Sequence, residues 1–521
     1  MFQNENTFGR FKAAGKEEEF HSSYDKAVEL AKKEFGKTYP MLIGGKEFLS
    51  SEGTFEHTSP SDLDLVLGRY QKGTRQDAKT AIAAARKAFE HWSQTPYHDR
   101  VAIYRRAATI ASEDKFKLAA EISFENGKNR FEAIADVDEG IDFLRYYAEQ
   151  LELNKGFEIE MGKILPNEHT KSVLKPYGVW SVIAPFNFPM AIAIGMSAGA
   201  SIVGNTIVLK PASDTPLLSY ELCKIMERAG LPSGVFNFVT GPGSTMGAEL
   251  IENTDVDGVV FTGSWDVGSR SLAEFEKIMP RPFIAEMGGK NATIVTDNAD
   301  LDKAVEGVIK AAFGYGGQKC SACSRVYVHK KLKDDFVKKL VEMACQLRIG
   351  DPTLRDTFLG PLINERAYKN YQGYIQEALS DAKIAFGGKV VNGKKKGYFV
   401  EPTIVTETPR DHKLVTTELF VPILTVETFE SFDEAVDRVN AVSYGLTSGI
   451  FSNDRTEIEE FFKRVKAGVL YANRVNGSTT GAMVGAQSFV GWKMSGSSGK
   501  GAGGPYYLQQ FLKEQSQTTY A

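Results

Sequence analysis

Cysteine is scarce in this sequence, with four residues among 521 at irregular spacing. A disulfide-stabilised extracellular scaffold is therefore excluded, and we expect reduced thiols. Basic residues are not in excess, because 62 Lys and Arg face 66 Asp and Glu, which argues against nucleic acid or an anionic membrane as a partner. The first twenty residues carry acidic side chains and no apolar core, unlike a secretory or transit peptide, so we expect a cytoplasmic location.

Charge is absent from one long stretch, residues 176–209, which is long enough to cross a bilayer. Pro185, Asn187 and Pro189 interrupt this stretch, whereas a membrane-spanning helix must satisfy its backbone hydrogen bonds continuously. A buried strand, helix and strand that are covered on both faces lack charge in the same way. We therefore predict no membrane partner and expect a small molecule to be the ligand.

The order of sequence patterns predicts an α/β fold. Up to residue 154, apolar residues recur every three or four positions at 77–94 and 99–127, which is typical of packed helices. Short alternating runs at 156–164 and 170–176 predict a β-hairpin. From residue 177 buried strands alternate with helices, and a second such series begins after Gly289. This alternation predicts two parallel-sheet units with right-handed crossovers, and ligands bind at the carboxyl ends of such strands.

Cys320 is a candidate nucleophile in the segment FGYGGQKCSACSRV, between a predicted helix and a predicted strand. Glycines just before it allow close backbone approach, and its own N–H can face a ligand oxygen. A buried structural cysteine is the competing interpretation. The C-x-x-C spacing with Cys323 also admits a dithiol or half of a zinc site, but no second cysteine pair supports it. Cys223 and Cys345 are isolated within helical patterns, where we expect core packing, so no metal is predicted.

Two polar residues are further candidates. Glu286 follows an apolar strand in FIAEMGGKN, where apolar surroundings would raise its pKa towards general-base duty, although a solvated turn carboxylate fits equally well. Asn187 lies inside the uncharged run, and it is either a structural turn residue or a hydrogen-bond donor held for a ligand. The sequence alone leaves both alternatives open.

Two strand ends are candidate dinucleotide sites. In FTGSWDVG, Gly263 permits close approach and Ser264 can cap a helix whose N-terminus accepts a phosphate. In NTIVLKPASDTP, Lys210 ends a strand and can hydrogen-bond a ribose, although a lysine in that position is more often solvated. Each motif is weak by itself.

Together these segments resemble the aldehyde dehydrogenase superfamily over nearly the whole chain. The family's Pro-Trp-Asn-Phe-Pro, Lys-Pro-Ala, Phe-Thr-Gly-Ser, Glu-Leu-Gly-Gly-Lys and Gly-Gln-x-Cys blocks appear in order, with Cys320 34 residues after Glu286. TTELFVPIL resembles the Glu-x-Phe-Gly-Pro block, with Val421 in place of the usual glycine. The resemblance implies a Rossmann-like parallel-sheet cofactor domain (1–154 and 177–288), an α/β catalytic domain (289–490) and β oligomerisation arms (155–176 and 505–521) in a homo-oligomer.

The resemblance also implies roles for single residues. Cys320 would attack an aldehyde as thiolate, Asn187 and the Cys320 N–H would hold the oxyanion, and Glu286 would activate the water that hydrolyses the thioester. NAD or NADP would accept the hydride, since Ser213 stands where NAD-preferring relatives often carry glutamate. The cofactor-binding residues implied are Ile183, Pro185, Phe186, Lys210, Ser213, Gly243, Gly263, Ser264, Gly288, Glu418 and Phe420.

Within the superfamily, three features resemble the group that oxidises glutamate 5-semialdehyde, formed from 1-pyrroline-5-carboxylate in proline catabolism. They are Ser321 after the nucleophile, the loop TTGAMVGAQSF with Gly481, Ala482 and Phe489, and the segment KGAGGPYYL. Backbone N–H groups and a serine hydroxyl suit a substrate carboxylate. Ser488 and Val490 depart from that group's usual proline and glycine. Another aliphatic or semialdehyde substrate, a CoA-acylating activity and a non-catalytic binding protein of the same fold are the alternatives.

Overall fold

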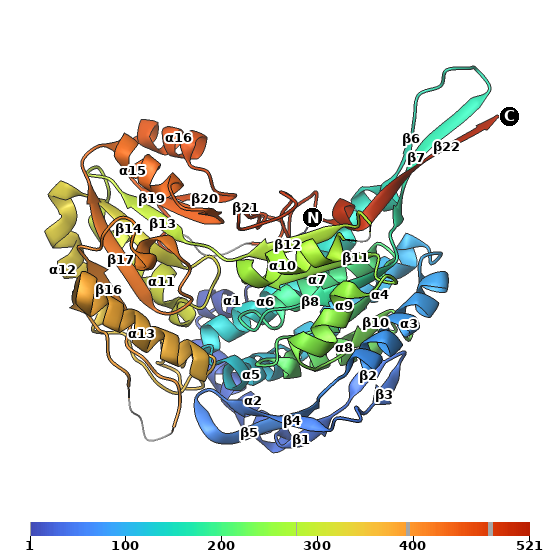
Figure 1. The fold of residues 1–521 in the computed structure, drawn as a ribbon, viewed down its shortest axis with the longest axis horizontal. Helices are drawn as coiled ribbons and strands as arrows, with labels where there is room; N and C mark the ends of the chain where they lie inside the picture. Colours follow the sequence, from blue (N-terminus) through green and yellow to red (C-terminus); the bar gives the residue numbers. More distant parts are fainter. Residues whose placement is uncertain (1, 278, 392–395, 478–482, 521) are drawn as a thin grey trace.

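The computed structural model describes residues 2–277, 279–391, 396–477 and 483–520. Two α/β units stand side by side, each built around a seven-stranded sheet, and a long arm projects from one of them (Figure 1). Strands alternate with helices through both units, which confirms the predicted fold class.

The first sheet has the order β12-β11-β8-β9-β10-β2-β3 and is parallel except at the β2 and β3 edge. The uncharged run supplies β8, α7 and β9, so the predicted strand, helix and strand are confirmed. No described helix is both long and apolar enough to cross a bilayer. The strands are β2 (Met41–Ile43), β3 (Lys46–Phe48), β8 (Val179–Ile183), β9 (Thr206–Lys210), β10 (Phe236–Phe238), β11 (Gly258–Gly263) and β12 (Phe283–Met287).

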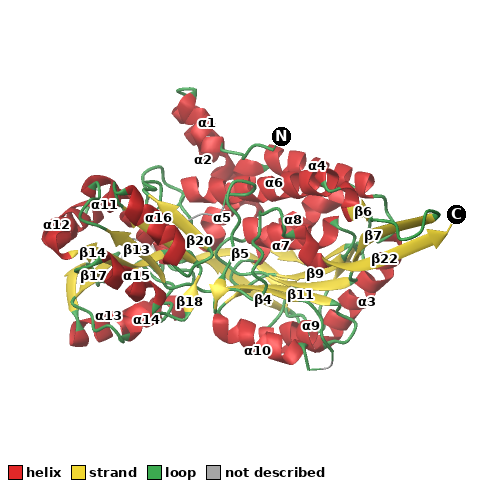
Figure 2. Cartoon of the chain, turned by 90° about the horizontal axis from the view of Figure 1, so that it is seen from above, coloured by secondary structure: helices red, strands yellow, loops and turns green. Residues whose placement is uncertain are grey.

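Helices cover both faces of this sheet (Figure 2). α3, α9 and α10 pack on one face, and α4 to α8 form the larger core on the other. The predicted helical pattern at 99–127 forms two helices, because the backbone at Asp114 leaves the helical range. The helices are α1 (Thr7–Ala13), α2 (Glu17–Glu34), α3 (Arg75–Trp92), α4 (Tyr97–Glu113), α5 (Lys115–Asn126), α6 (Arg130–Leu153), α7 (Ala191–Ile202), α8 (Pro216–Arg228), α9 (Ala248–Glu252) and α10 (Trp265–Phe275).

The second sheet has the order β15-β16-β17-β14-β13-β19-β20 and is parallel except for β15. Only three residues, 288–290, separate β12 from β13, so the segment that follows Glu286 joins the two sheets directly. The elements of this unit are β13 (Asn291–Val295), α11 (Leu301–Phe313), β14 (Cys323–His329), α12 (Lys333–Ala344), α13 (Glu365–Asp381), β15 (Lys383–Phe386), β16 (Thr403–Thr406), α14 (Lys413–Thr416), β17 (Ile423–Phe429), α15 (Phe432–Asn440), β19 (Thr447–Phe451), α16 (Arg455–Arg464) and β20 (Val469–Ala472).

Three small sheets complete the fold. The predicted hairpin is confirmed as β6 (Glu158–Glu160) and β7 (Glu168–Pro176), and β22 (Leu512–Tyr520) adds to β7 to make the projecting arm (Figure 1). The other two are β1 (Lys37–Tyr39), β4 (Thr54–Ser59) and β5 (Asp62–Gln71) in one sheet, and β18 (Tyr444–Gly445) with β21 (Trp492–Lys493) in the other.

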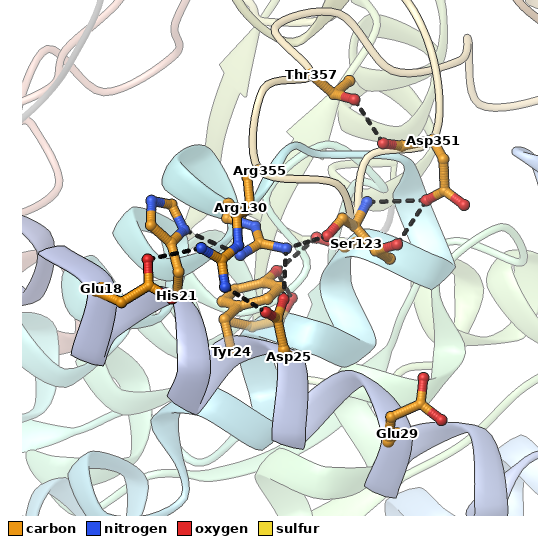
Figure 3. A network of polar contacts seen from close by, with 12 residues as sticks. Glu18, His21, Tyr24, Asp25, Glu29, Ser123, Arg130, Asp351, Arg355 and Thr357 are labelled. Carbon is orange, nitrogen blue, oxygen red and sulfur yellow. Dashed lines mark hydrogen bonds and ion pairs between the residues drawn. The ribbon is translucent and has the colours of Figure 1, made fainter.

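Arg130, the first residue of α6, ties the two units together. Its buried guanidinium donates to Asp25 on α2 at 2.9 Å and to the backbone oxygen of Thr353 in the second unit. Arg355 from the same loop as Thr353 also donates to Asp25 at 2.9 Å (Figure 3). The Arg355–Asp25 ion pair and the Arg130–Thr353 hydrogen bond thus join the two units beside the Asp25 carboxylate.

Candidate active site

A left-handed turn carries the chain from α11 to Cys320. Tyr315, Gly316 and Gly317, within the short helix η3 (Gly314–Gly317), have φ angles of 50°, 63° and 66°. A Cβ atom on Gly317 would lie 2.7 Å from the backbone oxygen of Val421, so a larger residue would displace the turn. The glycines before Cys320 in the sequence therefore allow the left-handed turn that leads to Cys320.

Two side chains anchor this turn. Tyr315 is the non-glycine residue in the left-handed region, and its hydroxyl donates to the backbone oxygen of Asn126 at 2.9 Å. Its N–H donates to Glu132 on α6, also at 2.9 Å. Gln318 accepts a hydrogen bond from the Ile363 N–H at 2.8 Å. Residues of both α/β units consequently hold the nucleophile loop in place.

The carbonyl of Cys320 is clamped from the start of β13. The Asn291 side-chain amide donates to the Cys320 oxygen at 2.7 Å and to the Ala322 oxygen at 2.9 Å, while its own oxygen accepts from the Thr447 N–H at 3.0 Å. A Cβ atom on Gly289 would lie 2.4 Å from that same Cys320 oxygen. The sequence analysis missed Asn291, although a polar residue opening a buried strand is a usable signal.

Cys320 is a free, partly exposed thiol. Burial raises its pKa above the usual range, and the carboxylates of Glu418 and Glu286 raise it further, while the N–H groups of Ser321 and of Cys320 itself act in the opposite direction. The N–H groups at the sulfur are those that stabilise negative charge there. Three of the predicted residues thus lie within electrostatic reach of one another.

Glu286 lies on β12, at the carboxyl edge of the first sheet. One carboxylate oxygen is buried and has no hydrogen-bond partner among the described residues. Burial raises its pKa well above the usual value, opposed by a hydrogen bond from the Gly491 backbone. The alternative of a solvated turn carboxylate is therefore wrong, and the residue has the environment of a general base.

Asn187 is buried in the bend between β8 and α7, with 3% of its surface exposed. The bend is pinned around it: Asp136 accepts from the Ala191 N–H at 2.8 Å, and its partner Lys128 lies 3.5 Å from the centre of the Phe188 ring. Among the described residues no hydrogen bond uses the Asn187 side-chain amide. A rigid bend with an uncommitted amide suits a donor kept for a ligand.

Three predicted cofactor residues end neighbouring parallel strands. Ile183 pairs with Lys210 where β8 and β9 end, and Gly263 pairs with Met287 where β11 and β12 end, so they share one edge of the sheet. Lys210 is buried, which excludes the solvated alternative, and burial lowers its pKa to about 8 against the effect of Asp214. Its ammonium donates only to the Pro211 oxygen, at 3.0 Å, among the described residues.

The remaining predicted cofactor residues form two groups. Glu418 accepts from the Gly289 N–H at 2.8 Å and packs against Gly288, where a Cβ atom would lie 2.2 Å from the carboxylate; burial raises the Glu418 pKa to about 7. Phe186, beside Pro185, meets Phe420 edge-to-face at 5.7 Å. The second group lies on exposed surface: Ser264 caps α10 by accepting from the Val267 N–H, and Ser213 and Gly243 are exposed.

The predicted substrate residues are only partly described. Ser321 is buried beside the nucleophile, and Phe489 forms an antiparallel bridge with Ala502 in the AGGP segment. Gly481 and Ala482 lie outside the described residues. Of the two departures, Ser488 fits against Gly504, where a Cβ atom would lie 2.6 Å from the serine Cβ, and Val490 is buried.

The four cysteines differ in ways that the sequence did not show. All are free thiols. Cys323 is buried and its sulfur shares a hydrogen bond of 3.3 Å with the Thr293 hydroxyl, and Cys223 is buried as expected. Core packing was the preferred interpretation for Cys345, and this is wrong, because that residue is exposed just beyond the end of α12.

Comparison with known proteins agrees with this geometry. Residues 48–516 match the model of the aldehyde dehydrogenase family. The chain belongs to that family. It is 37% identical to a 1-pyrroline-5-carboxylate dehydrogenase of Oceanobacillus iheyensis over 95% of each chain. A 1-pyrroline-5-carboxylate dehydrogenase from Thermus, solved with bound NAD, is 35% identical with a TM-score of 0.95 and covers 100% of this chain and 99% of its own. The betaine aldehyde dehydrogenase of Staphylococcus aureus in complex with NAD⁺ is 30% identical, with a TM-score of 0.89. The match covers 96% of this chain and 97% of that enzyme.

Proposed function

We propose that this enzyme oxidises L-glutamate 5-semialdehyde, formed from 1-pyrroline-5-carboxylate, to L-glutamate with NAD or NADP, as a step of proline catabolism. The observation that carries the proposal is the cluster of Cys320, Glu286 and Glu418 at the junction of the two sheets. The similarity over nearly the full length to dehydrogenases of that name supports the choice of substrate.

Cys320 begins the reaction by adding its sulfur to the aldehyde carbon, which gives a thiohemiacetal. Because burial raises the pKa of the thiol, its proton must leave to solvent before attack, and the N–H groups of Ser321 and Cys320 stabilise the thiolate that remains. The new oxyanion is held by the Asn187 amide and the Cys320 N–H, donors that the rigid bend and the clamped loop position in advance.

The residues at the sheet edge fit a dinucleotide. Lys210 has a buried ammonium with a single carbonyl partner among the described residues. The Glu418 carboxylate lies directly against Gly288, where a larger residue would displace it. These two side chains suit the ribose hydroxyls. Phe186, Phe420, Ile183 and Pro185 suit the nicotinamide side, and Gly243, Gly263 and Ser264 the pyrophosphate. When bound, the cofactor supplies the hydride acceptor that turns the thiohemiacetal into a thioester. Ser213 carries no charge to repel a 2′-phosphate, so both cofactors are accepted.

Glu286 completes the cycle. Its unpartnered oxygen is free to accept a proton from water, which then attacks the Cys320 thioester and releases the acid. The substrate carboxylate is held by the Ser321 hydroxyl and by the backbone N–H groups of Gly481 and Ala482, with Phe489 against the aliphatic part of the substrate. A carboxylate bound in this way needs no buried arginine.

We also infer a homo-oligomer assembled through the arms, residues 155–176 and 505–521. On the arm hairpin Ile159 is 63% exposed and Ile164 is 91% exposed, which is unfavourable for an isolated protomer. The first sheet with residues 1–154 and 177–288 acts as the cofactor domain, and residues 289–490 as the catalytic domain. The four free thiols suit a cytoplasmic location.

Steady-state rates with 1-pyrroline-5-carboxylate and with propanal, using NAD and NADP in turn, test this function. We expect kcat/KM for the pyrroline to exceed that for propanal by at least about tenfold, as hydrogen bonds to a carboxylate justify, with glutamate as the product. Equal values would favour a general aldehyde dehydrogenase. An acyl-CoA product would favour the CoA-acylating alternative. Turnover by the Cys320→Ala variant would show that Cys320 is not the nucleophile.

A further inference from the structure

The first residues of the chain lie along α6 and are bound by its carboxylates. The Phe2 N–H donates to Glu149 at 3.0 Å, and the Glu5 N–H donates to Asp142 at 2.7 Å. The Thr7 N–H and hydroxyl both donate to Asp138 at 2.7 Å. Because Asp138 and Asp142 are four residues apart, they share one face of α6 and hold this segment in a single register.

Asn4 extends from this segment to the part of the chain between β20 and β21. Its side-chain amide donates to Asp142 at 3.0 Å and, with its other hydrogen, to the backbone oxygen of Val484 at 2.7 Å. Phe2 supports the next residue of that loop, since a Cβ atom on Gly485 would lie 2.9 Å from the Phe2 ring. One amide thus joins α6 to residues 484–485, which are 480 positions away along the chain.

The same loop has a second support, which also rests on α6. The Gly485 N–H donates to the Gly503 oxygen at 2.9 Å, and the Gly503 N–H donates to the Tyr147 hydroxyl on α6 at 3.2 Å. Phe489 and Ala502 exchange two backbone hydrogen bonds of 2.9 Å. Only the Asn4 contact holds the Val484 carbonyl among the described residues.

We propose that Asn4 is a positioning residue for recognition of the substrate. By holding Val484, it fixes the course of residues 484–489, which end at Phe489. The inference rests on the proposed function, because Phe489 is taken to pack against the aliphatic part of glutamate semialdehyde. No contact among the described residues joins Asn4 to Cys320 or Glu286, so its removal weakens binding of this substrate and leaves the chemical step intact.

The test compares Asn4→Ala with Asn6→Ala in the full-length enzyme. Asn6 caps α1 by accepting from the Gly9 N–H at 3.0 Å and has no hydrogen bond to residues 483–490, so it is a matched control. For Asn4→Ala we expect the KM for 1-pyrroline-5-carboxylate to rise about fivefold, the effect of one buried hydrogen bond, with kcat and the KM for propanal unchanged. Asn6→Ala should change none of them. Phe2→Ala, which removes the ring that packs at Gly485, should move the KM in the same direction.

Hydrogen exchange separates this inference from the proposed function. In Asn4→Ala, and not in Asn6→Ala, we expect faster exchange at the amides of Gly485 and Phe489, whatever the substrate is. Unchanged exchange, or an unchanged KM for the pyrroline in an enzyme that prefers it, overturns the positioning role. A wild-type enzyme without that preference contradicts the proposed function instead, and the exchange data then decide the role of Asn4.

Discussion

The carbonyl oxygen of Cys320 has almost no room to move. Asn291 holds it by a hydrogen bond of 2.7 Å, and it lies so close to Gly289 that only a glycine fits there. The contacts to the Cys320 backbone therefore set the position of the sulfur. A small displacement of this backbone is costly because reaction requires close alignment of the attacking atom.

Replacement of Gly289 by alanine tests this packing. The added Cβ would meet a backbone oxygen at 2.4 Å, which cannot turn aside as a flexible side chain would, so we expect kcat to fall about 100-fold. Gly373→Ala is the matched control, since it adds the same methyl group within α13 where no atom lies within 4 Å. It should leave kcat unchanged. Similar activity in both variants would show that the loop is not confined in this way.

Glu286 makes the rate depend on pH. Its pKa is raised well above the ordinary value, so the carboxyl is protonated at low pH and its basic form becomes populated only as pH rises through the raised pKa. We expect hydrolysis of the thioester, and with it kcat, to increase with pH in that range. Glu286→Gln should lower kcat by at least about 100-fold, remove this increase and accumulate the acyl-enzyme, which intact-protein mass spectrometry detects. If Glu286→Gln keeps the pH dependence, another residue is the general base.

At the scale of helices and strands, the regular alternation between residues 177 and 345 was predictable, because buried strands and amphipathic helices carry distinct periods. The N-terminal strands β1 to β5 were not predicted. β1, β2 and β3 have three residues each, too few for a period, whereas β4 and β5 have six and ten residues and were missed although they are long enough to show one. The break at Asp114 carries no proline or glycine signal.

The candidate site was predictable to a different depth. Cys320, Glu286 and Asn187 stood out because motif order and spacing are local properties of the sequence. Asn291 and Asn4 did not, because their roles depend on contacts with Cys320 and Val484, 29 and 480 residues away. Such contacts exist only once both sheets have formed. The sequence therefore predicted the reacting groups better than the residues that hold them.

At the scale of the whole molecule, the arm is a feature whose apolar side chains stay exposed to solvent in a single protomer. Replacing Ile164 by aspartate places a charge on its most exposed apolar side chain, so we expect smaller species in sedimentation velocity, together with lower thermal stability. Leu379→Asp is the control: that leucine is 61% exposed on α13, away from the arm, and its replacement should leave the assembly intact. Assembly unaffected by Ile164→Asp would place the contact on another surface.

The pairing of β7 with β22 also has a consequence for how the protein is made. Nine residue pairs, from Leu512 with Pro176 to Tyr520 with Glu168, join strands that the ribosome produces more than 330 residues apart. One edge of β7 therefore stays open through most of translation, when unpaired strands are prone to associate with other chains. The charged and polar residues Lys171, Ser172 and Lys175 along β7 reduce that hazard. Closure of the arm should be among the last events of folding.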